Sequence, residues 1–358
     1  MENTILTPEV VANEALMCLT GNLVMADLVH RDYADDFVSV GDTISIRKPA
    51  KFVAKNFTGV TEPQDINEDK VTVKLDRFRD VTVAVTSKEM SLDIADFSAQ
   101  VVQPAMQAIA QAIDQDLLAV AAEKAGFRKA GTPNATDLSD IAALAKHLDT
   151  MKAPVQNRSL VLHPEHKYRY ALTENLSNVS YAGDNETLRD ALLGKVYTLE
   201  TYMDQNAPSS EAEVPGTAVS FNIAGGVGDT SVTVTDIKGG DIKAGDAFIL
   251  NGYCYRFLEG GTGDLDIDQP LMEDTFLTPV TVVNTPTSLA FHRNAIALVS
   301  RNLALPMGAA NAAYASAGGL GVRVVYDYDS ATKTDKISFD VIYGIKELEP
   351  DLICSLNG

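Results

Sequence analysis

The sequence predicts an α+β fold built from more than one domain. Its 358 residues exceed the ~250–300 residues at which a single hydrophobic core usually stops growing. A helical pattern covers residues 92–125, a two-armed β pattern covers 38–90, and a glycine-rich β pattern covers 217–285. These segments predict a long helix, an extended β-hairpin and an inserted β domain.

Residues 4–30 are predicted to be helical. Thr7 can cap a helix that starts at Pro8, because the first turn does not use the amide hydrogen that proline lacks. Apolar residues then recur at roughly helical spacing, at Val10, Val11, Ala15, Leu16, Leu19, Leu23 and Val24. The pair Gly21-Asn22 is expected to interrupt or bend this helix.

Residues 38–90 alternate apolar and polar side chains in separate stretches, as half-buried strands do. The alternating apolar positions are Ile44, Ile46, Val71, Val73, Leu75, Val81, Val83 and Val85. A two-stranded hairpin by itself is marginally stable in water. We therefore expect this excursion to lie on another surface, either in its own domain or on a neighbouring chain.

Residues 92–125 give the strongest helical pattern. One apolar stripe consists of Ile109, Ile113, Leu117 and Val120. A helix over the whole segment would be about 50 Å long. Pro104 is expected to kink this helix or to mark a restart, and Gly126 is expected to end it.

The second half of the chain predicts an α/β segment that a β-rich insertion interrupts. Residues 137–200 mix helical and strand patterns, and 205–216 has the composition of a linker. From 216 to 286 the chain has three basic and ten acidic residues, and short strands with turn signals predict a small barrel or sandwich. Strands are predicted again at 321–328 and 337–343.

Charge and cysteine content exclude several classes of function. The net charge of −20 disfavours sequence-independent nucleic-acid binding and docking on anionic membranes. No run approaches the ~20 apolar residues of a membrane span, and the first residues do not resemble a secretory signal. Cys18, Cys254 and Cys354 are predicted to be reduced thiols of a cytosolic protein.

The motifs that suggest chemistry do not have the required spacing. His163 and His166 stand three residues apart with Pro164 between them, whereas two ligands on a helix prefer a spacing of four. The acidic turn at 260–268 lacks the glycine and glutamate positions of a calcium loop. The glycines at 318–321 precede a strand, whereas a dinucleotide fingerprint follows one. We therefore predict no catalytic residue, no metal site and no cofactor.

Five stretches of the chain carry a family resemblance, at 40–49, 74–97, 104–117, 292–306 and 335–346. Together they resemble the P22-type major capsid (coat) proteins of tailed bacteriophages. They occur in the order of that family and span most of the chain. None is a catalytic signature, and their specificity lies in their joint occurrence and spacing.

The resemblance implies an HK97-like capsid fold with a long spine helix, an extended β-hairpin E-loop and an inserted small β-barrel domain. The implied parts are an N-terminal arm (1–37), the E-loop (38–90), a peripheral domain with the spine helix (91–134), the first part of an axial domain (135–216), the inserted β-barrel domain (217–285), the return of the axial domain (286–320) and the closing strands of the peripheral domain (321–358). The insertion is shorter than this family leads us to expect.

The implied function is that of a major capsid protein, which self-assembles into pentamers and hexamers of an icosahedral shell around the genome. Assembly would pass through a scaffold-guided procapsid in the host bacterial cytoplasm and end in the virion capsid. The implied partners are further copies of the chain, a scaffolding protein, a portal protein and packaged DNA, which is held without sequence-specific binding. No membrane partner is implied.

Six residues are candidates for contacts with other chains. We expect Phe52, Phe57, Arg77 and Arg79 of the E-loop to contact neighbouring subunits, and Glu9 and Glu14 are candidates for contact with a basic scaffold segment. Ordinary packing within the chain is the alternative for each. An acidic cytosolic enzyme of undetected type and a phage tail or adhesin binding module are the alternative functions. A discrete small oligomer would favour either of them, and a megadalton shell would exclude both.

Overall fold

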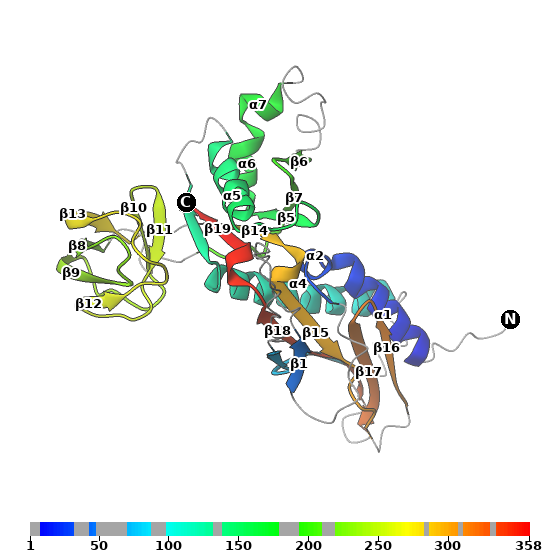
Figure 1. Ribbon diagram of the computed structural model, residues 1–358. Helices are drawn as coiled ribbons and strands as arrows, with labels where there is room; N and C mark the ends of the chain where they lie inside the picture. Colours follow the sequence, from blue (N-terminus) through cyan, green and yellow to red (C-terminus); the bar gives the residue numbers. More distant parts are fainter. Residues whose placement is uncertain are drawn as a thin grey trace, which may run out of the picture. The chain divides into compact units, whose positions relative to one another are not determined.

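The computed structural model describes ten stretches of the chain, which fold into two compact units (Figure 1). The described residues are 8–31, 43–47, 70–86, 98–131, 138–178, 193–209, 219–282, 286–306, 311–329 and 334–358. The first unit takes the described residues of Met1–Leu23, His30–Ile113 and Ile296–Leu348, and the second takes those of Val24–Val29, Asp114–Ala295 and Glu349–Gly358. Each unit therefore combines segments that are far apart in the sequence.

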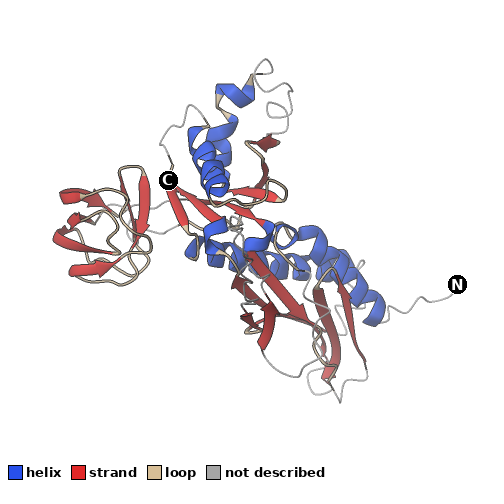
Figure 2. Ribbon diagram, in the orientation of Figure 1, coloured by secondary structure: helices blue, strands red, loops and turns tan. Residues whose placement is uncertain are grey.

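Five of the described strands form the sheet of the first unit (Figure 2). Its order is β15 (Ile296–Arg301), β18 (Thr334–Glu347), β17 (Leu320–Asp329) and β16 (Asn311–Ala317), with β3 (Arg77–Thr86) also paired to β18. All of these pairs are antiparallel. The 14-residue strand β18 is the centre of the sheet, because it pairs with β3, β15 and β17.

Gly318 and Gly319 make the tight turn between β16 and β17. Their φ angles are 57° and 81°, and a two-residue type I′ hairpin needs such left-handed angles at both central positions. Ala317 pairs with Leu320 directly across the turn. The glycine pair therefore sets the register of this hairpin, which explains why it precedes a strand.

The strands β1 (Thr43–Arg47) and β2 (Lys70–Lys74) pair antiparallel, with Thr43 opposite Lys74. Val73 is buried in a cluster with Ala297, Val299 and Leu348. Gly344 of β18 permits a close approach to β2, because a Cβ atom at this position would lie 2.2 Å from the carbonyl oxygen of Lys74.

Helix α1 (Pro8–Asn22) ends at the predicted Gly21-Asn22 break and packs on β16 and β17. Its buried apolar residues are Val11, Ala12, Ala15, Leu16 and Leu19. The prediction that Val10 belongs to this apolar face was wrong, because Val10 is 52% exposed. Successive residues of a helix are rotated by about 100°, so Val10 projects away from the face that Val11 and Ala15 share.

Helix α4 (Gln103–Glu123) follows a single π-helical turn, η1 (Ser98–Val102). The proline ring of Pro104 would clash with the carbonyl four residues earlier in a continuous α-helix. The wider turn before it removes this conflict, in agreement with the expected restart. The regular helix has 21 residues and is about 32 Å long, while residues 92–97 lie outside the described residues.

The described strands of the second unit include an eight-stranded mixed sheet. Its order is β10 (Ala247–Leu250), β11 (Tyr253–Arg256), β4 (Phe127–Ala130), β19 (Ile353–Asn357), β14 (Thr287–His292), β5 (Arg158–Leu162), β7 (Leu199–Met203) and β6 (Lys195–Val196). Every residue of β5, β14 and β19 is buried. We expected 321–358 to close one sheet. The structure divides this segment, because β19 pairs with β4 and β14 here while β17 and β18 belong to the first unit.

Short helices accompany this sheet. They are α2 (Met25–Leu28), α5 (Ser139–Thr150), α6 (Pro164–Ala171) and α7 (Glu174–Ser177), with the 3₁₀ turns η2 (Arg293–Ala295) and η3 (Pro350–Leu352). Helix α5 packs on β4, β14 and β19 and buries Ile141, Leu144 and Leu148. Within the described stretches, no helix combines the length and the apolar character that crossing a membrane requires.

Four described strands of the insertion form a separate antiparallel sheet in the order β12 (Gly263–Asp266), β9 (Ser231–Lys238), β8 (Ser220–Gly225) and β13 (Thr275–Thr281). Phe221, Phe248 and Phe257 are in mutual contact in its core. Strands β10 and β11 contribute Phe248 and Tyr255 to the same core. Tyr253 of β11 also pairs with Lys129 of β4, which connects the insertion to the larger sheet. The expectation of a small β-barrel stays a prediction.

Candidate functional site

Arg77 and Arg79 lie in β3, the strand that pairs with residues 334–343 of β18. Arg77 is half-buried and stands opposite Tyr343, while Arg79 is exposed and donates a hydrogen bond from Nε to the Tyr343 hydroxyl at 3.3 Å. Arg79 therefore has a partner in its own chain and also reaches the surface. The other two predicted contact residues, Phe52 and Phe57, lie outside the described residues.

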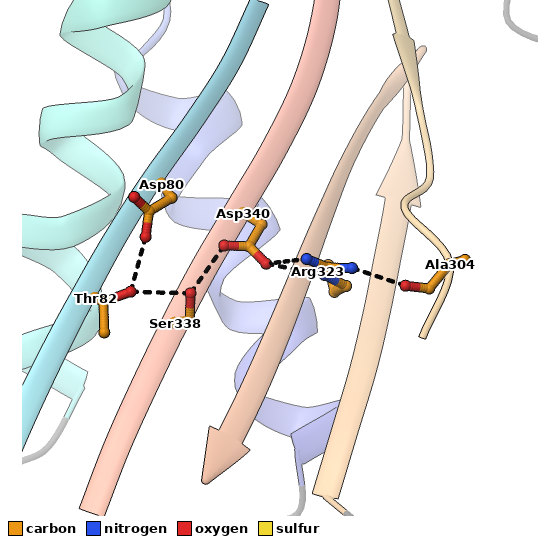
Figure 3. A network of polar contacts seen from close by, with 6 residues as sticks. All are labelled: Asp80, Thr82, Ala304, Arg323, Ser338 and Asp340. Atoms are coloured by element: carbon orange, nitrogen blue, oxygen red, sulfur yellow. Dashed lines mark hydrogen bonds and ion pairs between the residues drawn. The ribbon is translucent and has the colours of Figure 1, made fainter. Parts of the chain in front are cut away.

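A row of polar side chains crosses β3, β18 and β17 (Figure 3). Asp80 stands directly opposite Asp340, and Asp340 stands directly opposite Arg323. Arg323 donates from Nε to Asp340 Oδ2 at 2.9 Å and from Nη1 to the Ala304 carbonyl at 2.8 Å. Like charges opposite each other are destabilising in a sheet, and Arg323 neutralises the buried Asp340.

Two hydroxyls complete this row. Thr82 donates to Asp80 at 2.7 Å and lies 3.1 Å from Ser338, which in turn is 2.8 Å from Asp340 Oδ1. A one-residue slip of β3 along β18 would separate Thr82 from Ser338, whose hydrogen bond joins the two strands. This hydrogen bond therefore favours the observed register of β3. This row was not predicted, although polar residues at alternate positions of the predicted strands indicate a polar face.

The two predicted scaffold contacts differ in their surroundings. Glu9 is exposed in the first turn of α1, whereas Glu14 is half-buried and accepts a hydrogen bond from the Ser98 hydroxyl. Burial raises the pKa of Tyr326 to about 12, and the nearby Glu14 carboxylate acts in the same direction. Glu14 is thus engaged in packing within its own chain, and Glu9 is the more accessible of the two.

A buried ion pair joins the insertion to β4. Arg128 Nε lies 2.6 Å from Asp268 Oδ2, and the two side chains are 2% and 7% exposed. Arg128 also donates from Nη2 to the Glu123 carbonyl at 2.8 Å, and Asp268 Oδ1 accepts the Arg256 amide at 3.0 Å. Burial raises the pKa of Asp268, and the positive charge of Arg128 opposes that shift.

His163 and His166 have structural roles at α6. The Nδ1 atom of His163 accepts the Glu165 amide at 3.2 Å and so caps the helix. His166 Nδ1 lies 2.6 Å from the Ser288 hydroxyl, and Nε2 contacts the Gly358 oxygen. Burial lowers the pKa of His166 to about 4. Both His166 and Ser288 are buried, so this serine–histidine contact is closed to a substrate.

The described residues contain no grouping of three histidine, cysteine or carboxylate side chains that could hold a metal ion. The same part of the chain has three free thiols, of which Cys254 and Cys354 are buried. Burial raises the pKa of Cys254 to about 12, which keeps this thiol protonated and unreactive. The polar contacts described above join neighbouring segments within each unit.

The fold is similar to that of solved phage structures. A chain from a structure of Mycobacterium phage Che8 is 16% identical, with a TM-score of 0.58 over 93% of this chain and 90% of that chain. A chain from the capsid structure of cyanophage P-SCSP1u is 13% identical, with a TM-score of 0.52 over 93% and 87%. No family model and no curated protein matches the sequence. The chain thus shares an α+β fold, over most of its length, with a chain of a phage capsid.

Proposed function

We propose that the chain is the major capsid protein of a tailed bacteriophage and self-assembles into an icosahedral shell around the genome. The similarity to a capsid chain over 93% of the sequence carries this proposal, because it covers both units and the insertion. The role is structural rather than catalytic. The proposed place of the protein is the virion capsid, after assembly in the host bacterial cytoplasm.

The HK97-like, P22-type assignment of the parts belongs to the same proposal. In it, α4 is the spine helix, the region 38–90 with β1, β2 and β3 is the E-loop, and 217–285 is the inserted domain. In this division β5 and β14 belong to the axial parts (135–216 and 286–320), whereas β4 and β19, which belong to the peripheral parts (91–134 and 321–358), pair into the same sheet. Copies of the chain would meet as pentamers and hexamers, with a scaffolding protein and a portal protein as further partners.

Exposed residues on the two faces of β3 support a contact between subunits. Arg79 and Phe78 are both exposed, and Phe78 keeps 52% of its surface in water. Arginine and aromatic residues are the types most enriched where protein interfaces gain their affinity. Glu9, exposed on α1, remains the candidate for contact with a basic scaffold.

Sedimentation and negative-stain imaging of the purified protein, alone and with its genomic neighbours, test the proposal. Closed shells, or open polyheads and spirals without the scaffold, are the expected result. A stable monomer or small oligomer under every condition would refute it.

A double charge reversal tests the proposed role of β3. The variant Arg77→Glu with Arg79→Glu should keep a folded monomer, by circular dichroism, and lose shell formation. Normal shells from this variant would contradict the E-loop assignment.

A further inference from the structure

A buried carboxylate of α4 caps the short helix α2. Asp114 is 2% exposed, and its Oδ2 and Oδ1 atoms accept the amides of Val24 and Met25 at 2.8 and 3.1 Å. The start of a helix usually receives such a hydrogen bond from its own capping residue. Val24 occupies that position and has no side-chain oxygen to offer. Asp114 therefore supplies the cap, from a position 90 residues further along the chain.

The capped segment is short. Residues 24–29 belong to the second unit, whereas the chain on either side of them belongs to the first. The side chains of Met25, Ala26 and Val29 are fully buried. Six residues thus attach this part of the chain to the second unit, by apolar packing and by the two hydrogen bonds to Asp114.

A second buried carboxylate opposes the charge of the first. Asp204 directly follows β7 and is 3% exposed. Its Oδ1 atom accepts the backbone amide of Asn206 at 2.8 Å, whereas its buried Oδ2 atom has no hydrogen-bond partner within the described part of the chain. Burial raises the pKa of Asp114 to about 7. The hydrogen bond from the Val24 amide opposes this shift, and the Asp204 carboxylate adds to it.

The direction of this shift determines how the docking of residues 24–29 depends on pH. When the segment detaches, Asp114 gains contact with water, and a hydrated aspartate has a pKa of about 3.9. The docked state binds the proton more tightly than the detached state. Docking is therefore strongest below about pH 4 and weakens as the pH rises to about 7. Above that pH Asp114 is charged in both states, and the dependence ends.

We propose that protonation of Asp114 controls the docking of residues 24–29 on α4. The protonated carboxyl holds the segment in place, and its ionisation beside Asp204 loosens the segment. Two buried carboxylates near each other cannot both carry a charge without a large cost. The inference concerns the folded subunit and does not depend on the proposed function.

Other titratable groups on these elements differ from Asp114 in position. Asp27 of α2 and Glu200 of β7 are exposed. Asp116 points to another side of α4, because residues two apart on a helix are rotated by about 200°. His30 follows the segment and is half-buried. Histidine also titrates near neutral pH, so the experiment needs a variant of His30 as a control.

Hydrogen exchange of the full chain tests the proposal. Exchange of the amides of residues 24–29, corrected for the intrinsic effect of pH, measures how often the segment detaches. Protection should fall by about tenfold for each pH unit between 5 and 7 and should level off above pH 7. Helix α5 of the same unit is the internal reference and should not follow this course. Protection of residues 24–29 that stays constant from pH 5 to 7 would overturn the proposal.

Three variants identify the titrating group. Asp204→Asn keeps an oxygen for Asn206 but removes the opposing charge, so protection should level off at a lower pH. Asp114→Asn cannot ionise and should abolish the dependence on pH. His30→Gln should behave as the wild type, and loss of the pH dependence in this variant would assign it to the histidine and refute the proposal. If Asp114→Asn does not fold, Asp204→Asn still decides, because an unchanged pH profile in that variant contradicts the role of the carboxylate pair.

Discussion

Replacement of Arg128 by methionine tests whether a buried ion pair joins the insertion to β4. Arg128 Nε and Asp268 Oδ2 are 2.6 Å apart, in side chains that are 2% and 7% exposed. At an effective dielectric constant of about 20 their attraction is roughly 6 kcal/mol, and the lost hydration of several kcal/mol for each ion approximately offsets it. The intact pair therefore adds little to stability, whereas either ion alone is costly.

We expect Arg128→Met to lower the free energy of unfolding by about 3–5 kcal/mol, because Asp268 remains buried without its counter-ion. Asp268→Leu should cost a similar amount. The double variant should lie within about 1 kcal/mol of the wild type, because an apolar pair of similar volume needs no hydration.

Urea unfolding of the unassembled subunit, followed by circular dichroism, measures these differences. Tryptophan fluorescence is not an option because the chain has no tryptophan. A loss below about 1 kcal/mol in Arg128→Met, or a double variant as unstable as the sum of the single variants, would refute the reasoning.

Two further predictions concern stability. The pKa of His166 is lowered to about 4 from about 6.5 in the unfolded chain, so the unfolded state binds the proton first and stability falls as the pH drops from 6.5 to 4. Over this pH window the wild type should lose about 3 kcal/mol of unfolding free energy relative to His166→Gln. The measurement is the unfolding free energy of both proteins at each pH. A difference that stays constant with pH would contradict the burial of His166. Gly344→Ala should cost about 1–3 kcal/mol by overpacking, because its Cβ would meet the Lys74 carbonyl, and an unchanged urea midpoint would show that β2 does not approach β18 so closely.

The candidate site was only partly predictable. Arg79 and Glu9 are exposed as a contact residue must be, and their role between chains stays a prediction. Asp114 was missed, because a lone acidic residue in a helical pattern is typical of a solvated helix face. Only the folded chain brings the Val24 and Met25 amides to its carboxylate.

Several local elements could be predicted from short-range signals in the sequence. Two examples are the end of α1 at Gly21-Asn22 and the restart of α4 near Pro104. Each depends on residues within about one helical turn, so its signal is contained in a short stretch. The order of the strands was decided by tertiary structure. β19 pairs with β4 and β14 rather than with β18, and β11 of the insertion pairs with β4.

The pairs Arg128–Asp268 and Arg323–Asp340 likewise exist only in the folded chain. In the sequence each member is one charged residue among many. Burial then makes an unpaired charge so costly that each must find its partner. The alternation of apolar and polar residues predicts which face of a strand is buried. The choice of neighbouring strand depends on packing between side chains that are distant in the sequence. A short sequence pattern does not contain that information.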